Sequence, residues 1–208
     1  MTDLQARKQH ARTTLLARRR EQDKLQRATR STALQHQILQ SEVWQQAPIV
    51  VAFVGVRGEP LTDDLLVATL AAGKQLVLPR VSDDRKVIEF FTLPTLDALV
   101  PGTFGLREPP PHQPYDLASD PRALLLIPGL GFTRHGCRLG FGKGHYDRAL
   151  ACVASSHPPT RVGVCFDEAL DPAGLELPRD THDVLMHRIV TDRAWVTCPL
   201  ESKDHANT

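Results

Sequence analysis

The chain has 208 residues, of which 41% are hydrophobic and 24% charged, a composition typical of a globular protein with one good core. The formal net charge is only +1, so bulk electrostatics give no reason to expect nucleic-acid or membrane binding. The amino-terminus carries no apolar h-region, and no apolar run reaches the roughly 18 residues of a membrane span. The cysteines are far apart and form no CxxC pair, which favours reduced thiols in the cytoplasm over zinc or disulfides. They are Cys137, Cys152, Cys165 and Cys198.

The first 30 residues are basic, with nine Lys or Arg against three Asp or Glu. They contain neither Gly nor Pro and predict a helix. Its thin apolar stripe consists of Leu4, Ala11, Leu15 and Leu16. Lys8 and Arg12 are four residues apart and therefore share one helix face. These two cations either reach an anionic ligand or belong to a solvated basic face. RNA binding is a third interpretation, although no aromatic residues are interleaved to stack on bases.

A second helix is expected over residues 24–46, and an α/β pattern follows it. Residues 49–54 are a continuous apolar run, typical of a strand covered on both faces. Thr62 is expected to cap a helix over residues 63–72, which Gly73 ends. With a strand over residues 75–79, this order predicts parallel pairing and a right-handed crossover.

Glu59 follows the first expected strand directly. Ligands in open α/β sheets bind beyond the carboxyl ends of the strands, so Glu59 is a candidate ligand-binding residue. The alternative is an ordinary solvated turn residue. Further strands are expected at residues 87–93, 123–127, 161–166, 188–191 and 194–197.

Two loops and a tail complete the chain. The proline-rich residues 101–122 predict an extended loop that could serve as a lid. Residues 171–183 form a loop with Asp180, His182 and Asp183, in which His182 is either a metal ligand or solvated. We expect a single α/β domain over residues 1–198, with the basic helices of residues 1–46 packed on it, and a frayed tail over residues 199–208.

The glycine-rich stretch after the strand at residues 123–127 carries the strongest functional signal. Gly140, Gly142 and Gly144 alternate with Phe141 and Lys143, and such a loop can form a nest of N–H groups for an anion. A helix expected over residues 145–153 would point its N-terminus at the same place. The loop is not a Walker A motif, because Lys143 is followed by glycine rather than Ser or Thr.

Charged neighbours favour a phosphate-binding loop over a flexible turn. Arg138, Lys143 and Arg148 supply three cations close together. Asp147 is either a magnesium ligand beside the phosphates or a first-turn acid that interacts with the helix dipole.

The motif PGLGFTRHGCRLGFGKGHYDR resembles the signature of the 5-formyltetrahydrofolate cyclo-ligase family, which reads roughly PGxxFDxxGxRLGxGxGYYDR. Other segments resemble that family in the same order. They are Trp44 and Ala47 before the first strand, the GEPLT turn at residues 58–62, Gly73-Lys74 followed by Pro79, Glu108-Pro109, and His182-Asp183-Val184 before Thr191.

The resemblance implies an ATP- and Mg²⁺-dependent cyclisation of 5-formyltetrahydrofolate to 5,10-methenyltetrahydrofolate, with ADP and phosphate as the other products. It also implies an α/β fold with two N-terminal helices and a mainly parallel sheet flanked by helices, similar to the ribose-phosphate isomerase and CoA-transferase type. The implied partners are small molecules, with no nucleic acid and no membrane, and we expect a monomer.

Residue roles carry over from the same resemblance. The catalytic residues would be Lys143, Arg138 and Arg148. Mg²⁺ would be held by Asp147 and Asp183. The folate pocket would be lined by Glu59, Phe104 and Tyr146, with Phe104 standing where some members have tryptophan. ATP would be bound by Lys8, Arg12, Arg138, Gly140, Phe141, Gly142, Lys143, Gly144, His145, Tyr146 and Asp147.

Two residues depart from the family pattern. Thr133 replaces an aspartate, so any carboxylate role at that position is lost. His145 replaces a tyrosine with a group that titrates near neutral pH. Either change is tolerated variation or marks a paralogue that acts on another formyl, amide or sugar-phosphate substrate. A sugar-phosphate isomerase of the same fold is the rival enzyme, and the pair Asp147 and Asp183 argues against it.

Overall fold

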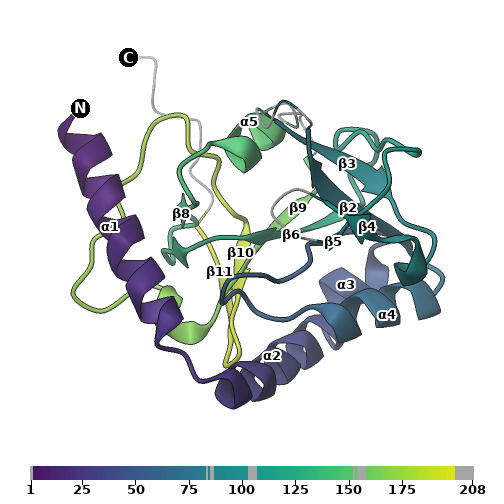
Figure 1. The fold of residues 1–208 in the computed structure, drawn as a ribbon, viewed down its shortest axis with the longest axis horizontal. Helices are drawn as coiled ribbons and strands as arrows, with labels where there is room; N and C mark the ends of the chain where they lie inside the picture. The colour runs from purple at the N-terminus through teal and green to yellow at the C-terminus, as the bar shows by residue number, and fades with distance from the viewer. Residues whose placement is uncertain are drawn as a thin grey trace.

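The structure is a computed structural model, and it describes residues 2–82, 84, 87–102, 107–151, 153 and 158–199. Within this part of the chain a seven-stranded sheet runs through the centre in the order β11-β10-β9-β6-β1-β2-β3 (Figure 1). The strands are β1 Ile49–Val51, β2 Gln75–Val81, β3 Ile88–Thr92, β6 Leu124–Pro128, β9 Thr160–Val164, β10 Arg188–Val190 and β11 Trp195–Thr197. The four central pairings are parallel, and β3 and β11 are antiparallel edges. The expected α/β fold with a mainly parallel sheet is confirmed.

Apolar side chains on both faces explain why these runs form parallel strands. In β6, Leu124, Leu125, Leu126 and Ile127 are all at most 2% exposed, and they alternate between two core clusters. One cluster lies under α2 (Lys24–Leu39), α3 (Glu42–Gln46) and α4 (Asp63–Ala71). The other is covered by α5 (His145–Ala151) and by loops after β6. A sheet buried on both faces leaves its strand ends as the place for a ligand.

Helix α1 (Asp3–Arg20) packs beside the sheet rather than on one of its two main cores. Its buried residues Ala11 and Leu15 meet Leu130, Leu139 and Leu177 in a small separate cluster. Leu139 belongs to the hairpin of β7 (Gly131–Phe132) and β8 (Arg138–Leu139). Figure 1 shows α1 standing next to this hairpin. The packing brings the basic face of α1 to the glycine-rich segment.

Two sequence expectations about helices were wrong in detail. The helix expected over residues 24–46 is broken after Leu39, because the hydroxyl of Ser41 caps a new helix by accepting the N–H of Trp44 at 3.3 Å. Thr62 makes no side-chain cap for α4. Its buried hydroxyl instead donates to the carbonyl of Phe53 at 2.6 Å and accepts the N–H of Gly55 at 3.3 Å. Thr62 therefore anchors the segment that follows β1.

The proline-rich segment is partly tied to the sheet. β4 (Val100–Pro101) pairs with β5 (Arg107–Glu108), and Pro114 forms an isolated bridge to Phe91 of β3. Residues 103–106 and 200–208 lie outside the described part of the chain, as does Cys152. No helix of the described residues has the length and apolar character needed to cross a membrane. The likeness to the ribose-phosphate isomerase type stays a prediction.

Candidate active site

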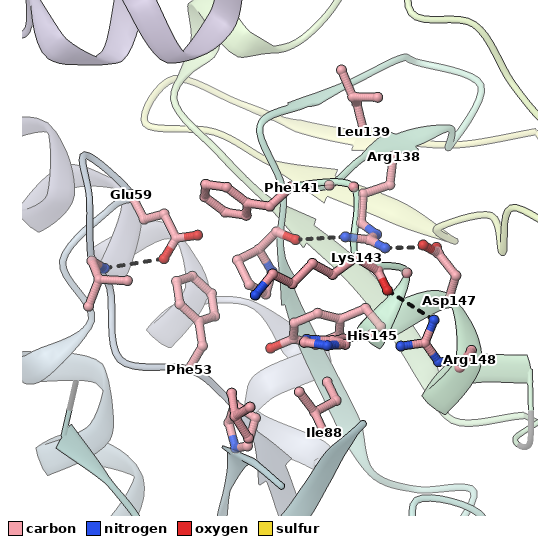
Figure 2. Close-up of a pocket in the computed structure, with 18 of the residues that line it drawn as sticks. Phe53, Glu59, Ile88, Arg138, Leu139, Phe141, Lys143, His145, Asp147 and Arg148 are labelled. Atoms are coloured by element: carbon pink, nitrogen blue, oxygen red, sulfur yellow. Dashed lines mark hydrogen bonds and ion pairs between the residues drawn. The ribbon is translucent and has the colours of Figure 1, made fainter. Parts of the chain in front are cut away.

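A cavity of about 500 Å³ opens where the central strands end. Residues after β1, the second half of β2 and the end of β6 form its floor, as expected for a ligand site in an open α/β sheet. Figure 2 shows the glycine-loop side chains opposite Phe53 and Glu59. The sequence-predicted residues along the cavity are Lys8, Arg12, Glu59, Arg138, Gly140, Phe141, Gly142, Lys143, Gly144, His145, Tyr146, Asp147, Arg148 and Asp183. Phe104 lies outside the described residues.

The glycine loop, residues 140–144, is shaped by its cationic neighbours. Gly142 and Gly144 have φ values of 92° and 65°, which favour glycine. A Cβ at Gly140 would come within 2.7 Å of a guanidinium nitrogen of Arg138, so glycine leaves room for that side chain. Arg12 of α1 donates its Nε–H to the carbonyl of Gly140 at 3.0 Å. The contact joins the N-terminal helix to the loop.

Arg138 is held inside the wall of the cavity. Its side chain is 5% exposed, and Nη2 donates to Oδ1 of Asp147 at 2.7 Å. Nη1 donates to the carbonyl of Pro128 at 3.4 Å, and the guanidinium lies 5.4 Å from the ring centroid of Tyr146. Figure 2 shows the guanidinium of Arg138 directed at Asp147. Arg138 therefore fixes Asp147 and Tyr146, and its charge is largely balanced within the protein.

Lys8 and Asp183 bind each other. Nζ of Lys8 lies 2.6 Å from Oδ2 of Asp183, and both side chains are at most 15% exposed. The N–H of Asp180 donates to the same oxygen at 2.7 Å. The pair joins α1 to the loop over residues 171–183 at the rim of the cavity. A predicted phosphate ligand and a predicted magnesium ligand thus neutralise one another in the structure.

The described residues contain no cluster of three or more His, Cys, Asp or Glu side chains arranged to hold a metal ion. Asp147 and Asp183 nevertheless both line the cavity with oxygen donors. Mg²⁺ is often held by one or two carboxylates together with water and substrate phosphates. The donor set is therefore compatible with Mg²⁺ that arrives with a phosphorylated substrate, and does not form a metal cage by itself.

Glu59 lies on the side of the cavity opposite the glycine loop and is only 4% exposed. The turn before it places Arg57 and Gly58 at positive φ. Oε2 of Glu59 accepts the N–H of Val56 at 3.2 Å, and Oε1 lies 4.0 Å from Nη1 of Arg19. Burial raises the pKa of Glu59, and the charge of Arg19 opposes this effect. The solvated-turn alternative for Glu59 is therefore wrong.

Tyr146 shares the electrostatic environment of Glu59. Burial raises the pKa of its phenol, the negative charge of Glu59 raises it further, and Arg138 acts in the opposite direction. Tyr146 therefore stays a neutral hydrogen-bonding group at any physiological pH. An aromatic face and a neutral hydroxyl suit the recognition of a planar heterocycle.

Sequence reasoning missed several residues of the site. Phe53 lines the cavity immediately after β1. Glu108 is 4% exposed and lies 3.8 Å from Nη1 of Arg80; the Glu108-Pro109 dipeptide was the available signal, although no role was assigned to it. Arg19 carried no signal, because its partner Glu59 is 40 residues away and only the tertiary structure joins them.

The two departures from the family pattern lie in different surroundings. Thr133 is not among the residues that line the cavity; its hydroxyl accepts the N–H of Cys137 at 3.2 Å and closes the turn between β7 and β8. Thr133 thus supports the local backbone. His145 does line the cavity, so this departure can affect ligand binding.

A mainly parallel sheet with a cation-flanked glycine loop and a buried carboxylate at its carboxyl edge is typical of α/β enzymes that act on small molecules. A model of the 5-formyltetrahydrofolate cyclo-ligase family matches residues 4–192. The chain belongs to the 5-formyltetrahydrofolate cyclo-ligase family.

Individual relatives agree with the family match. The chain is 35% identical over 153 residues to a 5-formyltetrahydrofolate cyclo-ligase of Mycolicibacterium smegmatis, covering 71% of this chain and 75% of the relative. It is 26% identical over 172 residues to the enzyme of that name from Mus musculus, covering 79% of this chain and 83% of the relative.

A solved structure has the same overall fold. The 5,10-methenyltetrahydrofolate synthetase of Aquifex aeolicus superposes with a TM-score of 0.77 at 25% identity, over 96% of this chain and 99% of that one.

Proposed function

We propose that the protein catalyses the ATP-dependent cyclisation of 5-formyltetrahydrofolate to 5,10-methenyltetrahydrofolate, with release of ADP and phosphate. The observation that carries this proposal is one cavity with two chemically different ends. The glycine loop with Lys143 and Arg148 lies opposite Glu59 and Phe53 (Figure 2). Arg12 adds a further cation, because it contacts the loop at the carbonyl of Gly140. A polyphosphate and a heterocycle can therefore meet inside a single site.

The chemistry requires activation of a poor electrophile. Nitrogen donates electrons into the formamide carbonyl and makes it resistant to attack. In the proposed reaction, the formyl oxygen attacks the γ-phosphorus of ATP, the bond to the β-γ bridging oxygen breaks, and ADP leaves. N10 then adds to the formyl carbon and loses its proton. Phosphate leaves with the former formyl oxygen, and the methenyl amidinium remains. No protein nucleophile takes part.

The protein would position the substrates and stabilise charge. Lys143 extends across the cavity toward Glu59 and Phe53 (Figure 2), where it can neutralise charge that develops on the transferred phosphoryl group. Arg148 donates to the carbonyl of Lys143 at 2.9 Å and supports the loop in this conformation. Arg138 would act mainly by fixing Asp147. Lys8 would exchange Asp183 for a phosphate oxygen.

Asp147 and Asp183 are the residues that would hold Mg²⁺, each with one oxygen already bonded to a cation of the chain. Bound with ATP, Mg²⁺ would neutralise phosphate charge and orient the γ-phosphate. The folate would contact Glu59 and Tyr146, with Phe104 as a further predicted contact. We also propose that the enzyme works as a monomer in the cytoplasm, on small molecules only.

Product formation with and without each substrate tests the proposal. The purified protein should generate the methenyl absorbance band only when ATP, Mg²⁺ and 5-formyltetrahydrofolate are all present, with one phosphate released per product. ATP binding without product formation would favour the alternative, a paralogue that acts on another formyl, amide or sugar-phosphate substrate.

A further inference from the structure

Arg19, in the last turn of α1, is a buried cation to which the reaction scheme assigns no role. Its side chain is 9% exposed, and Nη2 donates to the carbonyl of Gly129 at the start of the loop after β6. Nη1 is buried and has no hydrogen-bond partner within the described structure. Burying a guanidinium N–H without a hydrogen-bond partner costs free energy. The position of Nη1 in Arg19 therefore needs an explanation.

Nη1 of Arg19 lies beside the carboxylate of Glu59, which lines the cavity of the candidate active site. The two groups are 4.0 Å apart, and the side chain of Glu59 is 6% exposed. This separation is longer than a hydrogen bond but close enough for a strong Coulomb interaction in a buried setting. Burial lowers the pKa of Arg19 while the charge of Glu59 opposes that change. Each group thus supports the ionised form of the other.

We propose that Arg19 is a positioning residue for Glu59. The guanidinium of Arg19 holds the buried carboxylate of Glu59 in its ionised form, which accepts hydrogen bonds. This carboxylate faces the folate end of the cavity. An ionised carboxylate only accepts hydrogen bonds, whereas a protonated one also donates. The charge state of Glu59 therefore selects which substrate groups it can bind. The part of this inference that concerns folate rests on the proposed function.

Other charged groups face Glu59 from the surrounding elements. Arg27 of α2 donates to the backbone carbonyl of Glu59 at 2.8 Å, and Arg57 lies in the same turn. Both favour the ionised form of the carboxylate, although less than Arg19 does. The phenol of Tyr146 on α5 stays neutral beside it. Nη1 of Arg19 and Nη2 of Arg27 are both buried without a hydrogen-bond partner in the described structure. Of these two groups, Arg19 is the one that pairs with the carboxylate of Glu59, at 4.0 Å.

The test compares three variants of the full chain. Arg19→Gln removes the charge but keeps an amide N–H that can donate to Gly129. Arg19→Lys keeps the charge. Arg20→Met is the matched control, because it removes the neighbouring exposed cation of the same helix turn. Thermal unfolding of each variant reports whether the fold is retained.

The first readout needs no substrate. The side-chain carboxyl of Glu59, labelled with ¹³C and assigned by comparison with Glu59→Gln, is titrated by NMR. The apparent pKa of Glu59 should rise in Arg19→Gln, return toward the wild-type value in Arg19→Lys and stay unchanged in Arg20→Met. A purely structural role for Arg19 would not produce this pattern. An unchanged Glu59 titration in a folded Arg19→Gln protein would overturn the proposal.

The second readout is kinetic. At neutral pH, Arg19→Gln should lower kcat/KM for the folate roughly tenfold, which corresponds to one pKa unit of differential interaction, with the KM for ATP unchanged within twofold. The acid limb of the kcat/KM profile should move to higher pH. If the wild type forms no product while the NMR titration still shifts, the proposed function fails and the Arg19–Glu59 coupling stands. A loss of ATP affinity instead would contradict the assignment to the folate end.

Discussion

Lys143→Ala gives the sharpest test of the proposed charge stabilisation. Lys143 is exposed in the described structure and lies in the glycine loop, so its removal should leave the fold intact. A cation about 4 Å from a developing phosphate charge contributes on the order of 4 kcal/mol at an effective dielectric constant of about 20. Loss of one such group in known active sites costs roughly 2.7–4 kcal/mol. The expected decrease in kcat is therefore about 10²- to 10³-fold.

The assay follows methenyl absorbance under saturating ATP and folate. The KM for the folate should change by less than about threefold, because Lys143 would act on the transferred phosphoryl group rather than on the ground-state folate. Lys143→Arg should retain part of the activity, and Lys24→Ala, which removes an exposed lysine outside the cavity lining, should behave as wild type. Turnover of Lys143→Ala within threefold of wild type would refute the assignment.

Three further predictions follow from burial and charge. Glu59→Gln should raise the KM for the folate without changing the ATP affinity measured by calorimetry. Weaker ATP binding would contradict the assignment of Glu59 to the folate end of the cavity. Phe132→Ala should lower the free energy of unfolding by about 3–5 kcal/mol in urea titrations, since Phe132 is 0% exposed; a loss below about 1 kcal/mol would contradict this packing. The pKa of His187 is lowered from 6.5 to about 4, first by burial and then by Arg161 and Arg188. Stability should therefore fall as the pH drops from 6.5 toward 4, by about 1–2 kcal/mol after allowance for partial exposure, and His187→Gln should remove this component; an unaltered pH dependence would exclude it.

The central strands were predictable because their environment leaves a direct mark in the sequence. A strand buried on both faces needs consecutive apolar side chains, and residues 49–51 and 124–127 have them. The glycine loop was predictable for a similar reason, because positive φ and close approach to guanidinium groups require glycine at defined positions. Both signals are local.

The structural details that the sequence did not predict depend on one local helix cap and on several tertiary contacts. The break between α2 and α3 has neither Gly nor Pro, and it arises where Ser41 caps the second helix. Thr62 has the sequence position of a cap, yet its hydroxyl is engaged with the chain after β1. The pairs Lys8–Asp183 and Arg19–Glu59 join residues far apart in the chain. The hydrophobic periodicity of a sequence does not indicate which distant charged residue a buried group will contact in the folded protein.

Formation of 5,10-methenyltetrahydrofolate by the purified protein is the most direct measurement of the proposed activity. Absorbance at the methenyl band should rise only with ATP, Mg²⁺ and 5-formyltetrahydrofolate together, and the Lys143→Ala protein should show at least a 100-fold slower rise. A flat trace from folded wild-type protein that still binds ATP would contradict the cyclo-ligase assignment, and His145 would then be the first residue to examine for a change of substrate.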